Sequence, residues 1–183
     1  METLAANYLS TVVKRVSYYK DLADKAMAPL STEQLHFQAT SESNSIAVIV
    51  QHMAGNMLSR WTNFLTEDGE KEWRMRDAEF EEQRMQKEAV IALWEKGWDC
   101  YLSALRALQP DDLMKTVTIR NEGLTVTDAI NRQLAHYPYH IGQIIFISKM
   151  LQNENWKSLS IPKGGSERYN SSADIKDPAK KYQ

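Results

Sequence analysis

The sequence predicts an all-α protein, a four-helix bundle with a short β-hairpin between the third and fourth helices. Apolar residues recur at three- and four-residue steps through four long segments, which is the pattern of amphipathic helices. One short stretch instead alternates β-branched with other residues, as a pair of strands does. The composition fits this class, because 43% of the residues are hydrophobic, 25% are charged, and glycine and proline are few.

The first helix is expected over residues 4–27, and Pro29 with the polar run 31–44 ends it. Its apolar face is formed by Leu4, Tyr8, Leu9, Val12, Val16, Tyr19, Ala23 and Ala26. The second helix is expected from a cap at Asn44 or Ser45 to about residue 66. Its apolar face is formed by Ile46, Ile49, Val50, Met53, Met57, Trp61 and Phe64.

This second helix carries His52, which lies ~120° from the centre of the apolar face on a helical wheel. His52 shares the polar edge of the helix with Asn56, Ser59 and Asn63. A residue at such an edge faces either a neighbouring helix across a groove or water.

The connection over residues 67–86 is charged and has no clear helical period, yet it contains Trp73 and Phe80. The simpler interpretation is a solvated connection held by two aromatic anchors. A connection of this length inside one domain is also often functional. If it folds over a pocket, Arg74 and Arg76 are its candidate contacts to an anionic ligand.

The third helix is expected over residues 87–108, and Pro110 marks its end. Its apolar face is formed by Val90, Ile91, Trp94, Trp98, Tyr101, Leu102 and Leu105. Residues 115–120 and 123–126 then alternate as strands do on either side of residues 121–122, which predicts a short hairpin.

The fourth helix is expected from a cap at Thr125 or Thr127 to about residue 152, with Asp128 in its first turn. Pro138 lies inside it and deletes one backbone hydrogen bond, at ~3 kcal/mol in a straight helix. A bend with Pro138 on the convex side is compatible with a long helix that curves around the core. The helix must continue past Pro138 for the residues on either side of it to share one face.

Two of the four histidines, His136 and His140, are four residues apart in this helix. That spacing places both imidazoles on one face, with Cβ atoms roughly 6 Å apart, in a stripe that we expect to face the core. Ala129, Ile144, Ile147 and Leu151 complete this stripe. Buried imidazoles need partners, which either a shared metal ion or Gln133 and Gln143 can provide.

Together with His52 on a facing helix, the pair would give three imidazole ligands for a divalent ion, with a further position open to another molecule. Imidazole suits Zn²⁺, Ni²⁺, Fe²⁺ and Co²⁺ alike, so the ligands do not select among them. No glutamate lies between the paired histidines in the manner of zinc proteases, and no nucleophile elbow or phosphate-binding glycine loop is present. The catalytic residues stay unassigned.

Charge and cysteine content exclude other classes of protein. A net charge of −2 and a pI near 6.1 offer no basic surface for nucleic acid. Cys100 is the one cysteine, so there is no internal disulfide, and we expect a buried inert thiol. The first residues lack a secretory leader and no stretch approaches ~18 apolar residues, so a cytoplasmic protein without a membrane span is expected.

The chain has the length of one domain, expected over residues 1–170. Up to about residue 170, scattered apolar residues can dock the segment that follows the fourth helix. Residues 171–183 are polar and predict a mobile C-terminal tail.

Several motifs resemble the DinB/YfiT-like superfamily, and the likeness covers nearly the whole chain. In the two histidine-bearing helices these motifs are SIA at 45–47, QHMAGN at 51–56, RQLAH at 132–136 and HIGQ at 140–143. Within this superfamily, the chain resembles a functionally uncharacterised branch through RWTNFLTEDGEK at 60–71, WRMRD at 73–77 and SIPKGGS at 160–166. Pro138 departs from the motif of the superfamily.

The resemblance implies a dimeric four-helix bundle in which His52, His136 and His140 hold a divalent metal. It also implies an enzyme that acts on a small molecule through a low-molecular-weight thiol cosubstrate, in S-transfer or isomerisation, or through water in hydrolysis. Arg74 and Arg76 are then candidates to hold carboxylates of the substrate. The alternative is a dimeric, stress-associated metal-binding protein without turnover, because activity does not follow from fold.

Overall fold

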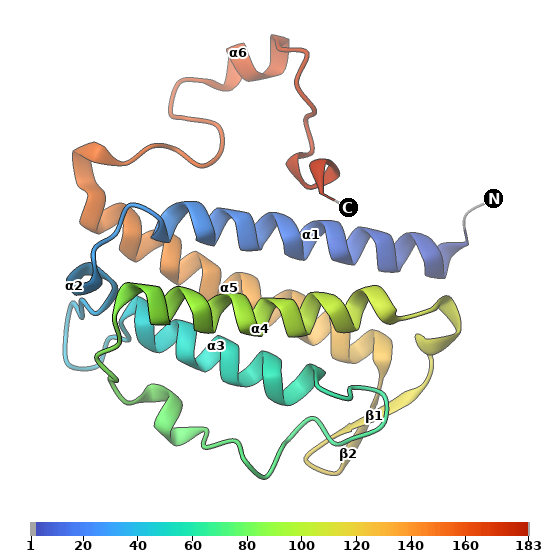
Figure 1. Ribbon diagram of the computed structural model, residues 1–183. Helices are drawn as coiled ribbons and strands as arrows, with labels where there is room; N and C mark the ends of the chain where they lie inside the picture. Colours follow the sequence, from blue (N-terminus) through green and yellow to red (C-terminus); the bar gives the residue numbers. More distant parts are fainter. Residues whose placement is uncertain (1–2, 183) are drawn as a thin grey trace.

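The computed structural model describes residues 3–182 as a mostly helical protein with one small antiparallel sheet (Figure 1). Its four long helices are α1 (Leu4–Met27), α3 (Ile46–Trp61), α4 (Lys87–Ala107) and α5 (Val126–Gln152). Two short helices, α2 (Thr32–Leu35) and α6 (Ser166–Ser171), and a hairpin of β1 (Thr116–Ile119) and β2 (Glu122–Thr125) complete the regular structure, with four 3₁₀ turns between them.

The four long helices enclose the core. Helix α3 packs along α4 and α1 along α5, and further contacts join α1 to α4 and α3 to α5. The largest fully buried side chains are aromatic and include Trp94, Trp98, Tyr101 and Tyr137. A Cβ at Gly97 would lie 2.9 Å from the Cα of Ala54, so this glycine permits the close approach of α4 to α3.

The predicted helices form, and most of their ends agree with the sequence. Ser45 caps α3 by accepting a hydrogen bond from the backbone N–H of Val48 at 3.2 Å. The predicted end of this helix near residue 66 is wrong, because the chain leaves the helix at Thr62 and Asn63 adopts a left-handed φ of 51°. Phe64 nevertheless stays buried, since the turn that follows folds back onto the core.

Helix α5 runs without interruption through Pro138. The side chain of Thr125 caps it by accepting from the backbone N–H of Asp128 at 3.1 Å, which was one of the two predicted caps. The condition for His136 and His140 to share one face of a helix is therefore met.

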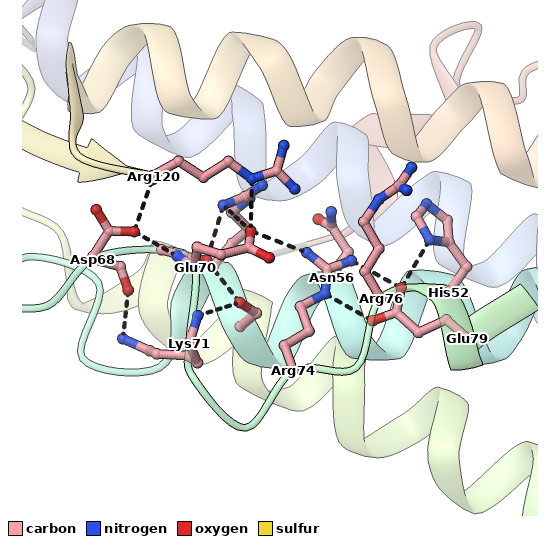
Figure 2. Close-up of polar contacts among 12 residues, drawn as sticks. His52, Asn56, Asp68, Glu70, Lys71, Arg74, Arg76, Glu79 and Arg120 are labelled. Atoms are coloured by element: carbon pink, nitrogen blue, oxygen red, sulfur yellow. Dashed lines mark hydrogen bonds and ion pairs between the residues drawn. The ribbon is translucent and has the colours of Figure 1, made fainter.

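The turn of the hairpin lies one residue earlier in the sequence than expected. Its two turn residues are Arg120 and Asn121, with φ of 56° and 63°, instead of residues 121–122. Two consecutive left-handed residues match the strand twist in a two-residue turn, but they are unfavourable for arginine. The turn is stabilised by Asp68, whose carboxylate accepts the backbone N–H groups of both turn residues at 2.9 Å. Figure 2 shows the contact with Arg120.

The C-terminal segment runs from the end of α5 through α6 and returns to α1, so that its last 3₁₀ turn, Pro178–Lys181, lies beside that helix (Figure 1). Arg15 donates two hydrogen bonds to Asp177 at 2.7 and 2.6 Å, Ala179 is buried, and the hydroxyl of Tyr182 donates to Asp21 at 2.7 Å. The domain boundary at residue 170 stays a prediction, but residues 177–182 are in contact with the first helix.

None of the helices between residues 3 and 182 is both long enough and apolar enough to cross a bilayer.

Replacing Asp68 by Asn should destabilise the protein by about 1–3 kcal/mol, because a charged acceptor of several backbone N–H groups is lost. Although burial acts to raise it, the backbone N–H groups of Asn121, Glu70 and Arg120 hold the pKa of Asp68 below its ordinary value. A lowered carboxyl pKa stabilises the fold at pH values above the ordinary pKa, and this contribution is lost as the pH falls.

Urea unfolding from pH 7 to pH 3 tests this, since the difference between wild type and Asp68→Asn should shrink as the pH falls. Asp77→Asn is the control, because that carboxylate is fully exposed in the same connection. A difference that stays constant with pH would contradict the role of the charge.

Candidate metal centre

Three histidines from two facing helices meet in one cluster. His52 comes from α3, and His136 and His140 come from successive turns of α5. Their candidate ligand atoms all lie within 4.8 Å of one another. The Nε2 atom of His136 is 3.4 Å from Nε2 of His52 and 3.0 Å from Nε2 of His140. Ligands of one tetrahedral ion at ~2.0–2.1 Å are about 3.3 Å apart, so this spacing suits a single metal ion.

The opposite nitrogen of each ring has an oxygen partner of its own. Nδ1 of His52 lies 3.1 Å from a carboxylate oxygen of Glu79. Nδ1 of His136 lies 3.2 Å from Oε1 of Gln133, and Nδ1 of His140 lies 2.9 Å from Oε1 of Gln143. These oxygens are acceptors, so each Nδ1 donates, and the lone pairs of the three Nε2 atoms are left facing one another. Metal-binding histidines have this arrangement, with the second nitrogen held by a carboxylate or a carbonyl group.

Burial favours the neutral, ligating form of the pair on α5. Burial, together with the neighbouring His140 and His52, lowers the pKa of His136 to about 4. Burial also lowers the pKa of His140, although its hydrogen bond with Gln143 acts in the opposite direction. Both side chains are therefore uncharged at neutral pH, as binding of a divalent ion requires.

Glu79, from the 3₁₀ turn Asp77–Phe80, holds His52 in position (Figure 2). Arg74 in turn donates to both carboxylate oxygens of Glu79, through Nε at 2.7 Å and Nη2 at 2.9 Å. Burial acts to raise the pKa of Glu79, but the hydrogen bonds from His52 and Arg74 lower it below its ordinary value. The carboxylate thus stays ionised and brings negative charge to the histidine cluster.

Gly55 provides the space for this carboxylate. A Cβ at this position of α3 would lie deep inside the van der Waals radius of the Glu79 carboxylate. The glycine costs helix stability, by roughly 0.5–1 kcal/mol relative to alanine, so a close approach of another group explains its presence.

The connection over residues 67–86 is more than a solvated link, since it packs on α3. The side-chain amide of Gln51 donates to the backbone carbonyls of Glu79 and Glu81 at 3.2 and 3.0 Å. Phe80 lies against the ring of His52, with ring centroids 4.8 Å apart, whereas Trp73 is 58% exposed.

The two candidate anion contacts in this connection differ. Arg74 is buried in its ion pair with Glu79, so it is not free to hold a carboxylate of a ligand. Arg76 is half exposed, and its guanidinium lies over the ring of Phe80 at 5.5 Å. Sequence reasoning missed Glu79, because one glutamate within a charged run carries no spacing signal, and only Phe80 beside it pointed to a docked segment.

His136 and His140, which were expected to face the core, do not lie at the centre of the buried face of α5. Both are half buried at its edge, whereas Tyr137, Ile141 and Ile144 occupy the centre. The buried hydroxyl of Tyr137 is satisfied by donating to Asn56 at 3.0 Å and accepting from Trp61 at 3.2 Å. His52, in contrast, is buried and faces α5, which was the first of its two predicted orientations.

His36 and Cys100 lie outside the cluster. His36 pairs with Glu82 and with the backbone carbonyl of Met85 at 2.7 Å. Cys100 is half buried instead of fully buried, and its sulfur contacts Thr62 at 3.5 Å.

The family model described as a protein of unknown function (DUF1572) matches residues 3–165. The chain belongs to this family. No curated protein and no solved structure matches the sequence. The matched range contains the four long helices, the hairpin, the three clustered histidines and Glu79. In this DUF1572 chain, α6 and the segment docked on α1 follow the matched range.

Replacing Glu79 by Gln should lower metal affinity about 10–100-fold, because the charge that orients His52 is lost. Gly55→Ala should act in the same direction, since the added methyl group displaces the carboxylate. Zn²⁺ affinity is measured by competition with a chromophoric chelator, and circular dichroism confirms that the variants fold.

Glu81→Gln is the matched control, because that side chain is exposed and lies two residues from Glu79. Unchanged Zn²⁺ affinity in Glu79→Gln would show that the carboxylate does not support the cluster.

Proposed function

We propose that this protein is a metal-dependent enzyme in which His52, His136 and His140 hold a divalent ion. The convergence of three Nε2 atoms, with every Nδ1 held by an acceptor, is the observation that carries this proposal. The resemblance of both histidine-bearing helices to the DinB/YfiT-like superfamily supports it. The proposal includes the four-helix-bundle fold of that superfamily, formed by α1, α3, α4 and α5.

The metal is one of Zn²⁺, Ni²⁺, Fe²⁺ or Co²⁺, all of which imidazole suits. When bound, such an ion supplies a Lewis acid that lowers the pKa of a coordinated thiol or water. The proposed reaction is attack on a small electrophile, by a low-molecular-weight thiol as in S-transfer or by water as in hydrolysis.

The residues of the chain prepare the site for such a reaction. Glu79, Gln133 and Gln143 fix the ring orientations of the three histidines, so little reorganisation is needed when an ion binds. Among residues 3–182 the cluster contains three protein ligands, which is the number typical of catalytic metal sites that bind a further molecule. His136 and His140 are half buried, which supports approach of that molecule from their side of the cluster.

A homodimer is part of the proposal and is supported by the resemblance alone. The alternative function, a dimeric and stress-associated metal-binding protein without turnover, requires the same three ligands. The two functions are separated by turnover and not by metal content.

Replacing His136 by Ala should reduce bound metal from about one equivalent to background, because its Nε2 lies between those of the other two histidines. Elemental analysis of protein purified without an affinity tag, after incubation with Zn²⁺ or Ni²⁺, measures this. His36→Ala is the control, since His36 lies outside the cluster and should leave the metal content unchanged. Metal retained in His136→Ala would refute the assignment.

The metal-loaded protein is then screened with thiols against epoxides and activated halides, and with esters for hydrolysis. Turnover that is lost in His136→Ala supports the enzyme. A fully loaded protein that turns over none of these substrates would favour the metal-binding protein.

A further inference from the structure

A pocket of about 540 Å³ lies beside the histidine cluster, between one face of α5 and the loop that precedes α3. The α5 wall consists of Tyr139, Gly142, Gln143, Phe146, Ile147 and Met150. These positions follow the three- and four-residue steps of one helix face. The volume is within the range of pockets that hold small molecules.

The pocket is lined mostly by apolar side chains, with Glu42, Ser43, Asn44 and Gln143 as its polar residues, and it is open to solvent. Tyr139 is 62% exposed and Phe146 is 69% exposed on α5, and Phe37 on the opposite wall is 39% exposed. Exposed aromatic side chains that cluster in this way are more typical of a binding site than of the rest of a protein surface. An apolar ligand would remove part of this surface from water.

Gly142 leaves space on the α5 side of the pocket, because it has no side chain. A Cβ at this position would meet no atom within 4 Å, so packing against the rest of the chain does not require a glycine. Glycine inside a helix is destabilising by roughly 0.5–1 kcal/mol relative to alanine. The space that it leaves lies within the pocket.

The pocket is connected to the histidine cluster through a shared side chain. Gln143 lines the pocket, and its Oε1 is the partner of Nδ1 of His140 at 2.9 Å. Tyr139, on the same wall, places its ring edge-on to His140 with centroids 4.9 Å apart. A molecule in the pocket therefore lies one side chain away from a proposed metal ligand.

The charge of the lining restricts what can bind. Among residues 3–182, Glu42 is the one charged side chain that lines the pocket, and no lysine, arginine or histidine lines it. Of the two candidate anion contacts, Arg74 is buried against Glu79, and Arg76 is not among the residues that line the pocket. An anionic group in this pocket would lose hydration without gaining a cationic partner, which is unfavourable.

We propose that the pocket binds the apolar part of an uncharged small-molecule substrate and presents it to the metal centre. The assignment of substrate class rests on the proposed function, whereas the pocket itself can be tested without metal. Under this proposal the substrate is an uncharged aromatic or alkyl compound, and not the carboxylate-bearing substrate that was expected from Arg74 and Arg76.

Two fluorescent probes with the same aromatic framework test this on the metal-free protein. N-phenyl-1-naphthylamine is uncharged, and 8-anilinonaphthalene-1-sulfonate carries an additional sulfonate. We expect the uncharged probe to bind with one-to-one stoichiometry and the sulfonate to bind about tenfold more weakly or worse. Gly142→Leu should weaken binding of the uncharged probe about tenfold or more by filling the pocket.

Ala107→Leu is the control, because it places the same side chain at a separate surface pocket beside α4. Equal binding of the uncharged probe by wild type and Gly142→Leu, or equal affinity for the two probes, would overturn the proposal. So would absence of probe binding together with a dimer that Gly142→Leu dissociates, since a second copy of the chain would then cover this face.

A second readout links the pocket to the metal. In Co²⁺-loaded protein, the uncharged probe should shift the visible absorption bands, because the pocket and His140 share Gln143. If the protein contains metal but does not bind the probe, the pocket proposal alone is refuted. Absence of metal from wild type, with the probe still bound, defeats the proposed function and leaves the pocket.

Discussion

Lone pairs on nitrogen repel one another at about 3 Å, and this repulsion is the constraint on which the centre of the molecule depends. The Nε2 atoms of His52, His136 and His140 are brought to such distances by packing of α3 against α5 and by the acceptors on their Nδ1 atoms. A cation between them converts the repulsion into coordination. The hydrogen bonds on the three Nδ1 atoms fix the rings so that the Nε2 lone pairs point toward one another, which is the arrangement that a divalent ion requires.

Much of the fold and part of the site could be predicted from local sequence patterns. The four long helices follow from the recurrence of apolar residues, and the position of His136 beside His140 follows from helical geometry. The pairing of these residues with Gln133 and Gln143 is also local, since each glutamine is one turn from its histidine. The two expected partners, metal and glutamine, are compatible, because a metal would bind Nε2 of a ring whose Nδ1 is already held by glutamine.

Other features could not be predicted, because they depend on contacts between segments distant in the sequence. Glu79 reaches His52 only because the connection folds back on α3, and nothing in the spacing of a charged run indicates that path. The hairpin turn falls at Arg120 because Asp68 binds its backbone N–H groups from another segment. For the same reason, Arg74 is a partner of Glu79 and not a free contact for ligands.

The fit of Glu79 against Gly55 also restricts how this family can diverge. A side chain larger than hydrogen at position 55 cannot coexist with a carboxylate held by Arg74 at its observed place. Loss of the glutamate would remove the requirement for glycine at position 55. Alanine would then be favoured there, because it is the better helix former. In relatives of this chain the two positions should therefore change together, so a substitution at one of them would record the loss of the supporting charge at the other.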